Sequence, residues 1–421
     1  MYAKKIKQKK LSWGAIALVA PFPSHDVVSL AGSVLGGERY FDKEEIADIH
    51  AELLMEGTAK RSKKEIQEFL DSIGASLGFS SGGERLHFSA KVRPQHLGAL
   101  IELIAECLSM PTFPEPELAV LKMREAANLE LEAENTNAQA SIALARFLFK
   151  HDHPNYADTT NESKAALKSI TGKRLREEHA KMIDGRSLII SLAGDITAAK
   201  GFALVEKHFK TLPKHKVIFK SFAKAAVSPA KSASVTIVNK ASIDYVLGLA
   251  TGALNTAPDY PALVLGIQIL GNRGGFTGRL MKTVREEEGL TYGIYALLSG
   301  FKSNVDGYLY VWATFAPQLF EKGKASIKRQ LDLLLTHGVS EDEVKKHAML
   351  YDAKSKVQLS NSGAYARAAH DVIVDGKKLS YLDEFPKKIL KLKAKDVQAA
   401  LKKYLLVKNM SEAAAGTFEN S

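Results

Sequence analysis

An internal duplication is the feature of this sequence that most restricts the fold. Three pairs of segments match at shifts of 223, 225 and 222 residues: 84–97 with 307–320, 113–122 with 338–347, and 170–183 with 392–405. Three matches at nearly one spacing indicate two copies of one unit. A chain of 421 residues is also too long for one ordinary core. We therefore expect two similar domains, 1–210 and 233–421, joined by the lysine-rich linker 211–232.

Strand and helix patterns follow one another in the first copy without strict βαβ alternation. Apolar segments bounded by turn residues predict strands at 14–21, 27–35 and 85–92. Ser62 and Glu65 have the spacing of a capping box and predict a helix over 62–73. This order predicts an α+β fold of two homologous domains, each an antiparallel-rich sheet with helices packed on one face.

Composition points to a globular chain without a membrane span. Hydrophobic residues make up 46% and charged residues 25%, and no apolar run approaches the roughly 20 residues of a membrane helix. The apolar segment 11–21 follows several lysines, but it is better interpreted as a strand than as a signal peptide. The single Cys107 lies on an apolar helix face, which predicts a core residue and no internal disulfide. We expect a cytoplasmic protein, with the periplasm or an organelle matrix as alternatives.

The formal net charge of +11 comes mainly from lysines at the chain ends and in the linker. Lysines are concentrated near the N-terminus, in 207–231 and in 387–408. A nucleic-acid-binding protein would instead gather its cations on one face, interleaved with aromatic residues. The distribution predicts a solvated basic surface and no nucleic-acid partner.

The segment 270–295 begins with a glycine loop and continues into a charged helical pattern. Gly278 and Gly289 bracket about ten helix-compatible residues, the spacing of a short helix that ends at a glycine. Leu280 and Val284, four residues apart, mark its buried side. From the residues alone, this is a basic helix followed by a strand.

The segment DIHAELLMEGT (48–58) resembles the active-site helix of the pitrilysin and mitochondrial-processing-peptidase family of zinc peptidases. That helix carries an inverted motif, His-x-x-Glu-His, in which two histidines bind zinc and the glutamate acts as general base. Aligned on the apolar pair and Gly-Thr that follow the motif, the resemblance places Asp48 and Glu52 at the two histidines and Ala51 at the glutamate. Because a methyl group takes no proton from water, the resemblance implies a degenerate site.

The family also needs a third metal ligand, a glutamate some seventy residues downstream. The resemblance places Asn128 or Leu129 there, with Glu130 one register slip away. A hard cation held by Asp48, Glu52 and Glu130 remains an alternative. We otherwise expect no metal and no cofactor in this chain.

Two further histidine groups have weaker motifs. LREEH (175–179) is half of an inverted zinc motif, but Leu175 stands in place of the first ligand and the helix has a packing role in both repeats. His151 and His153 in KHDHPNY are two residues apart and would need further ligands. A structural role is predicted for both groups.

The segment GRLMKTVREEEGLTYG (278–293) resembles the second-domain signature of the same family. The match assigns the signature's arginine to Arg285 and its tyrosine to Tyr292. The resemblance implies that the two domains close as a clamshell and that this pair holds the scissile carbonyl and developing oxyanion of a peptide. The neighbouring glycines, which could contact substrate or partner or simply form turns, are Gly274, Gly275 and Gly289.

The resemblance therefore implies a chain that keeps the substrate clamp and lacks the metal and base. The leading hypothesis is a non-catalytic subunit of a heteromeric zinc peptidase. Its expected partners are a homologous zinc-bearing subunit and a peptide or unfolded polypeptide substrate, and activity is expected only with that subunit. The alternatives are a structural core-type subunit without proteolytic work, a solo peptidase with an unusual metal site, and an anion or nucleic-acid binder.

Overall fold

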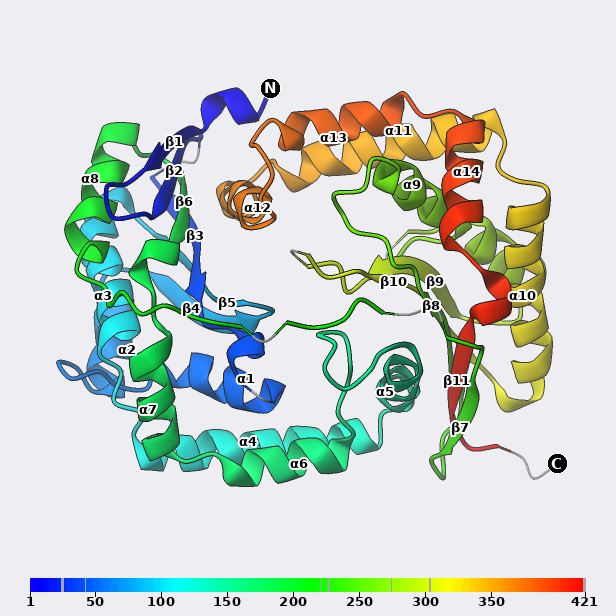
Figure 1. The fold of residues 1–421 in the computed structure, drawn as a ribbon, viewed down its shortest axis with the longest axis horizontal. Coiled ribbons are helices and arrows are strands. Elements are labelled where there is room, and N and C mark those ends of the chain that lie inside the picture. Colours follow the sequence, from blue (N-terminus) through cyan, green and yellow to red (C-terminus); the bar gives the residue numbers. More distant parts are fainter. Residues whose placement is uncertain are drawn as a thin grey trace. The chain divides into compact units, whose positions relative to one another are not determined.

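Short strands assemble into two separate sheets, each with its own core (Figure 1). The computed structural model describes residues 1–23, 26–41, 43–219, 221–225, 228–273, 275–302 and 304–418. Its two compact units combine distant parts of the chain: Met1–Ala127, Glu162–Ser221 and Ser355–Glu384 in the first, and Asn128–Asn161, Phe222–Lys354 and Phe385–Ser421 in the second.

The first sheet has the strand order β1-β2-β6-β3-β5-β4. Its strands are β1 (Lys7–Lys10), β2 (Ile16–Pro21), β3 (Val28–Leu35), β4 (Ser76–Gly82), β5 (Arg85–Val92) and β6 (Ile189–Gly194). The ladder between β2 and β6 is parallel, and the others are antiparallel. The helices within this unit are η1 (Ala3–Lys5), η2 (Glu38–Tyr40), α1 (Glu44–Leu53), α2 (Lys63–Ser72), η3 (Pro94–His96), α3 (Leu97–Ser109), α7 (Gly172–Met182), η4 (Gly185–Ser187), α8 (Ala198–Phe209) and α12 (Ser362–Val374).

One face of the first sheet is apolar and packs against α8, which in turn packs against α3. The approach is close at Gly201, where an added Cβ would come within 2.7 Å of a methyl group of Val19. The predicted capping box at the start of α2 is present, since Ser62 accepts from the Glu65 N–H and the Glu65 carboxylate accepts from the Ser62 N–H. Cys107 on α3 is fully buried, which confirms its predicted place in the core.

The second sheet has the order β7-β11-β8-β10-β9. Its strands are β7 (Ser232–Thr236), β8 (Ile243–Ala250), β9 (Gly293–Ser299), β10 (Tyr308–Phe315) and β11 (Ser411–Gly416). The ladder between β7 and β11 is parallel, and the others are antiparallel. The helices of this unit are α5 (Thr136–Leu148), α9 (Tyr260–Leu270), the π-helix η5 (Met281–Glu287), η6 (Pro317–Leu319), α10 (Phe320–Thr336), α14 (Ala394–Tyr404) and η7 (Val407–Asn409). The helices with residues in both units are α4 (Glu115–Ala133), α6 (Thr160–Ser169), α11 (Glu341–Gln358) and α13 (Tyr381–Leu390).

The two sheets share one topology, which confirms the predicted duplication and the α+β class. The order β6-β3-β5-β4 of the first sheet is repeated as β11-β8-β10-β9 in the second. The parallel neighbours also correspond, β2 beside β6 and β7 beside β11. In both copies, a proline-led turn, η3 or η6, connects the strand next to the edge, β5 or β10, to the following helix.

Two helices pack on the sheet that is formed mainly by the other half of the sequence. Helix α5, from the first half, packs on β8 and β11, and α12, from the second half, packs on β3 and β6. Buried residues such as Leu144 of α5 and Tyr365 of α12 belong to these cores. The units therefore do not coincide with the expected segments 1–210 and 233–421. Each sheet also has helical cover on part of its second face, rather than on one face alone.

A search of the described helices finds none that is long and apolar enough to cross a membrane.

Candidate functional site

Helix α1 carries the three degenerate motif positions on two different sides. Asp48 and Glu52, four residues apart, are exposed, whereas Ala51 is 1% exposed and packs in the core. The carboxylate of Glu52 is paired with the guanidinium of Arg124 on α4. Ala51 offers no proton acceptor, and Glu52 is already engaged by a cation. This helix therefore lacks the groups that polarise water on a metal.

Asp48 lies among other carboxylates. Desolvation of its carboxyl group, together with repulsion from Glu44, Glu38, Glu125 and Glu52, raises the pKa of Asp48 to about 7. Although the residue as a whole is exposed, the carboxyl group is therefore partly protonated at neutral pH. A metal ion that bound to this carboxyl group would have to displace its proton.

The donor set does not fit zinc. Asn128 and Glu130 are exposed on α4 and belong to the second unit, whereas Asp48 and Glu52 belong to the first. Within the described parts of the chain, no group of three or more His, Cys, Asp or Glu side chains is arranged to hold a metal ion. Because Asp48 and Glu52 belong to the first unit and Glu130 to the second, the alternative cage of these three residues stays a prediction.

The histidine of α1 that sequence reasoning passed over, His50, is buried in the first unit. Its Nε2 lies 2.9 Å from Nδ1 of His179, and Nε2 of His179 lies 3.1 Å from the carbonyl oxygen of Leu108. A carbonyl only accepts, so His179 carries its proton on Nε2 and accepts on Nδ1 from His50. Nδ1 of His50 is then a buried acceptor with no partner among the described residues.

Both imidazoles of this pair are held neutral. Burial, followed by the neighbouring His179, lowers the pKa of His50 well below its usual value. Burial lowers the pKa of His179 to about 4, against the opposing hydrogen bond to Leu108. The rings of Phe41 and Phe113 lie 5.1 and 5.3 Å from that of His50. The pair is a structural element of the first core, which agrees with the predicted structural role of LREEH.

In the second unit, the segment predicted as a short helix forms the π-helix η5 over Met281–Glu287, rather than an ordinary α-helix. Leu280 and Val284 are fully buried, as their spacing predicted. The N–H of Glu288 donates to Thr283 at 2.9 Å, and Gly289 ends the helix with a φ of +62°, a conformation suited to glycine. Such wide turns change which side chains share a face and recur at functional sites.

Arg285 lies on η5, half-buried, without an acidic partner in the described structure. Its guanidinium lies 5.2 Å from the ring centroid of Phe276, and Nη1 lies 3.6 Å from Sδ of Met281. An aromatic face and a thioether attract a cation without neutralising it. Arg285 therefore keeps its charge available to an external acceptor, and Phe276, which sequence reasoning did not single out, restricts its position.

Tyr292 is 92% exposed immediately before the edge strand β9. The backbone beside it is held by Thr291, whose hydroxyl donates to the Thr314 carbonyl and accepts from the N–H of Gly293 at 3.1 Å. A fixed backbone thus presents a solvated phenol. Gly275 and Gly289 lie before and after η5, and Gly274 lies outside the described residues. Arg285 and Tyr292 belong to the second unit, and the α1 positions belong to the first.

Comparison with known proteins yields two family models and several relatives. Residues 169–351 match the model described as the Peptidase M16 inactive domain, and residues 23–151 match Insulinase (Peptidase family M16). An uncharacterized zinc protease of Streptomyces coelicolor is 23% identical over 84% of this chain and 76% of its own length. A non-peptidase homolog, YmxG, of Helicobacter pylori is 23% identical over 62% of this chain and 59% of its own length. The solved structure of a peptidase M16 inactive domain from Pseudomonas fluorescens has a TM-score of 0.88, with 23% identity and 99% of both chains covered.

Proposed function

We propose that this chain, an inactive member of peptidase family M16, is the non-catalytic subunit of a heteromeric zinc peptidase. It supplies Arg285 and Tyr292 to a peptide that a homologous, metal-bearing subunit hydrolyses. The observation that carries this proposal is the state of Arg285, a half-buried guanidinium positioned by Phe276 with its charge left unpaired among the described residues.

The chemistry of the two side chains suits the transition state of peptide hydrolysis. Negative charge develops on the carbonyl oxygen, and preorganised donors stabilise it more than they stabilise the ground state. Arg285 offers permanently charged donors, and the Tyr292 phenol adds a neutral one. In the proposed complex the partner's zinc supplies the Lewis acid and the activated water, because α1 of this chain has Ala51 at the position of the base.

The preference for a working subunit over a scaffold rests on exposure. Phe276 and Tyr292 are 73% and 92% exposed, which costs solubility and contributes nothing to the core. A scaffold subunit has no use for an exposed aromatic ring stacked on an unpaired arginine, or for a second exposed ring on the segment that follows. A ligand-contacting surface has such a use.

The proposal is tested by reconstitution. The purified chain and a homologous subunit with an intact His-x-x-Glu-His motif are assayed for cleavage of a quenched fluorescent peptide, separately and together. We expect activity above that of the motif-bearing subunit alone on mixing, and a loss of about 10²–10³ in turnover for Arg285→Ala. Tyr292→Phe should lower turnover in the same direction. Lys282→Ala, an exposed cation on the same helix, is the matched control and should leave activity unchanged.

Size-exclusion chromatography shows whether each variant still assembles, which separates a lost contact from a lost complex. Stoichiometric zinc in this chain or robust activity without the partner would contradict the proposal. Full activity of both clamp variants in an assembled complex would favour the scaffold role instead.

A further inference from the structure

Strand β7 forms one edge of the second sheet, and its outer side is open among the described residues. Its ladder with β11 is bounded by two hydrogen bonds, from the Glu412 N–H to the Lys231 carbonyl and from the Ile237 N–H to the Gly416 carbonyl. Because successive residues of a strand turn their N–H and C=O groups to opposite sides, the odd-numbered residues serve β11. Ser232, Ser234 and Thr236 therefore direct their backbone donors and acceptors to the open edge.

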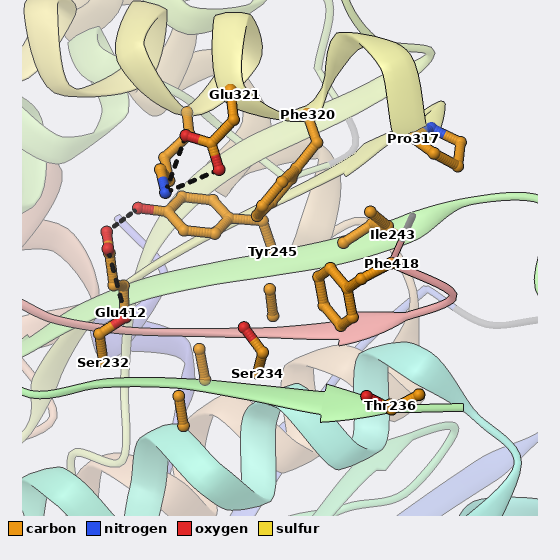
Figure 2. A pocket seen from close by; sticks show the side chains of 14 residues that line it. Ser232, Ser234, Thr236, Ile243, Tyr245, Pro317, Phe320, Glu321, Glu412 and Phe418 are labelled. Carbon is orange, nitrogen blue, oxygen red and sulfur yellow. Dashed lines mark hydrogen bonds and ion pairs between the residues drawn. The ribbon is translucent and has the colours of Figure 1, made fainter. Parts of the chain in front are cut away.

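The side chains of these same three residues line a hollow of about 470 Å³ beside the strand (Figure 2). Its wall is aromatic: Tyr245 and Phe418 lie on either side of Phe320, with ring centroids 6.0 and 6.1 Å from it. Ile243 and Pro317 extend the apolar surface, and Ala413 and Ala414 of β11 also line it. The hollow has room for one large apolar side chain.

The charged groups at this hollow cancel in pairs. Glu321 lies 3.0 Å from Nζ of Lys324, and Glu412 lies 2.7 Å from Nζ of Lys328. The Tyr245 hydroxyl donates to Glu412 at 2.6 Å, and burial together with this carboxylate raises the pKa of Tyr245. With no net charge among these groups, the hollow is complementary to an uncharged side chain and offers no counter-ion to a charged one.

The composition of β7 also differs from that of an edge protected against pairing. Edge strand β1 of the first sheet reads Lys-Gln-Lys-Lys and is exposed throughout, so its charges oppose the addition of another strand. Strand β7 reads Ser-Ala-Ser-Val-Thr, with neither charge nor proline. Nothing in its side chains opposes a further strand.

We propose that β7 and the adjoining hollow bind an extended, uncharged segment of a partner protein by β-strand addition. The segment pairs with the backbone of Ser232, Ser234 and Thr236 and places one aliphatic or aromatic side chain against Phe320. Alternate residues of the segment contribute affinity through backbone hydrogen bonds, and the side chain in the hollow contributes specificity.

This site is separate from the segment that carries Arg285 and Tyr292. Strands β7 and β9 are the opposite edges of the sheet, with β11, β8 and β10 between them. At about 4.8 Å per strand spacing, the two edges are roughly 19 Å apart. The proposal therefore holds whether or not the chain acts in peptide hydrolysis, and its occupant is a docking segment rather than the bond that reacts.

The test uses the full-length protein and a fluorescein-labelled peptide, Thr-Val-Phe-Val-Thr-amide, in an anisotropy titration. Ser234→Pro removes one backbone N–H from the open edge and none from the ladder with β11, a position at which a strand tolerates proline. We expect this substitution to weaken binding about tenfold, the loss of about one net hydrogen bond. Ser234→Ala, which keeps the backbone N–H, should weaken binding less than Ser234→Pro does. Gln8→Ala, on the exposed edge strand β1 of the first sheet, is the control and should bind as the unchanged protein does.

A second variant tests the hollow. Ala414→Leu fills the floor and should weaken binding of the phenylalanine peptide, while a peptide with serine in place of phenylalanine should already bind weakly to the unchanged protein. Thermal midpoints within a few degrees of that protein's show that each variant is folded. The proposal is overturned if the unchanged protein shows no saturable binding up to about 1 mM. It is also overturned if the folded Ser234→Pro and Ala414→Leu variants bind the phenylalanine peptide as tightly as the unchanged protein does.

Discussion

The buried histidine pair predicts that the first unit loses stability in mild acid. His179 and His50 are neutral in the folded protein, and the pKa of His179 is about 4, compared with 6.5 for a solvated imidazole. As the pH falls below 6.5, the unfolded chain takes up protons that the folded chain does not. The stability due to the neutral pair is therefore fully present above pH 6.5 and is lost progressively towards pH 4.

The size of this effect follows from the shift. Each pH unit within that window costs up to about 1.4 kcal/mol per histidine. For His179 alone, the free energy of unfolding should fall by roughly 2 to 3 kcal/mol between pH 7.5 and 4.5. His50 adds a loss in the same direction. A domain stable by 5–15 kcal/mol would register this clearly.

The assay follows unfolding of the first unit alone. The chain has two tryptophans, Trp13 in the first unit and Trp312 in the second, so Trp312→Phe leaves a reporter of the first. Urea titrations at several pH values compare this protein with a His179→Gln variant, whose amide can still donate to the Leu108 carbonyl but does not titrate. We expect the fall in the free energy of unfolding between pH 7.5 and 4.5 to be roughly 2 to 3 kcal/mol smaller in this variant.

Gln8→Ala is the control, because it changes an exposed side chain of the first unit that does not titrate. This substitution should leave the pH dependence unchanged. If His179→Gln retains the full pH dependence of its parent, the assignment of a neutral buried pair is wrong.

Two further outcomes follow from buried groups. His153 faces the Asp306 carboxylate at 3.3 Å, and both side chains are almost fully buried. His153→Ala should therefore destabilise the second unit by about 3 kcal/mol in urea titrations followed by Trp312 fluorescence, and adding Asp306→Asn to this variant should recover part of the loss. Cys107 is buried, and burial raises the pKa of its thiol to about 12, so 5,5′-dithiobis(2-nitrobenzoate) should react with it no faster than the chain unfolds; immediate reaction in native buffer would refute this.

The duplication and most elements could be predicted from the sequence because they depend on local pattern. Strand β5 has strictly alternating burial, and the Ser62–Glu65 capping box uses residues three apart. The exchange of α5 and α12 could not be predicted in this way. An amphipathic pattern shows that a helix buries one face, but it does not show which sheet receives that face.

The same distinction between local pattern and long-range packing applies to the candidate site. The loss of the base at Ala51 and the buried side of η5 could be predicted, because they depend on residue identity and on spacing within one helix. The His50–His179 contact joins residues 129 positions apart on α1 and α7 and has no local signature. The π-helical turn of η5 and the stacking of Arg285 on Phe276 depend on how a glycine loop folds back, which spacing alone does not determine.

The exchange of α5 and α12 also sets an order of events during synthesis. The last strand of the first sheet, β6, is complete at Gly194, but the helix that covers its second face ends at Val374. At 5–20 residues per second, a ribosome needs roughly 10–40 s to make the intervening chain. Throughout this interval Leu18, Ala31 and Ala193 lack their partners Tyr365 and Ala369. Until α12 has been made, the first sheet of the nascent chain keeps part of its second face uncovered, and a chain truncated after the linker would never cover it.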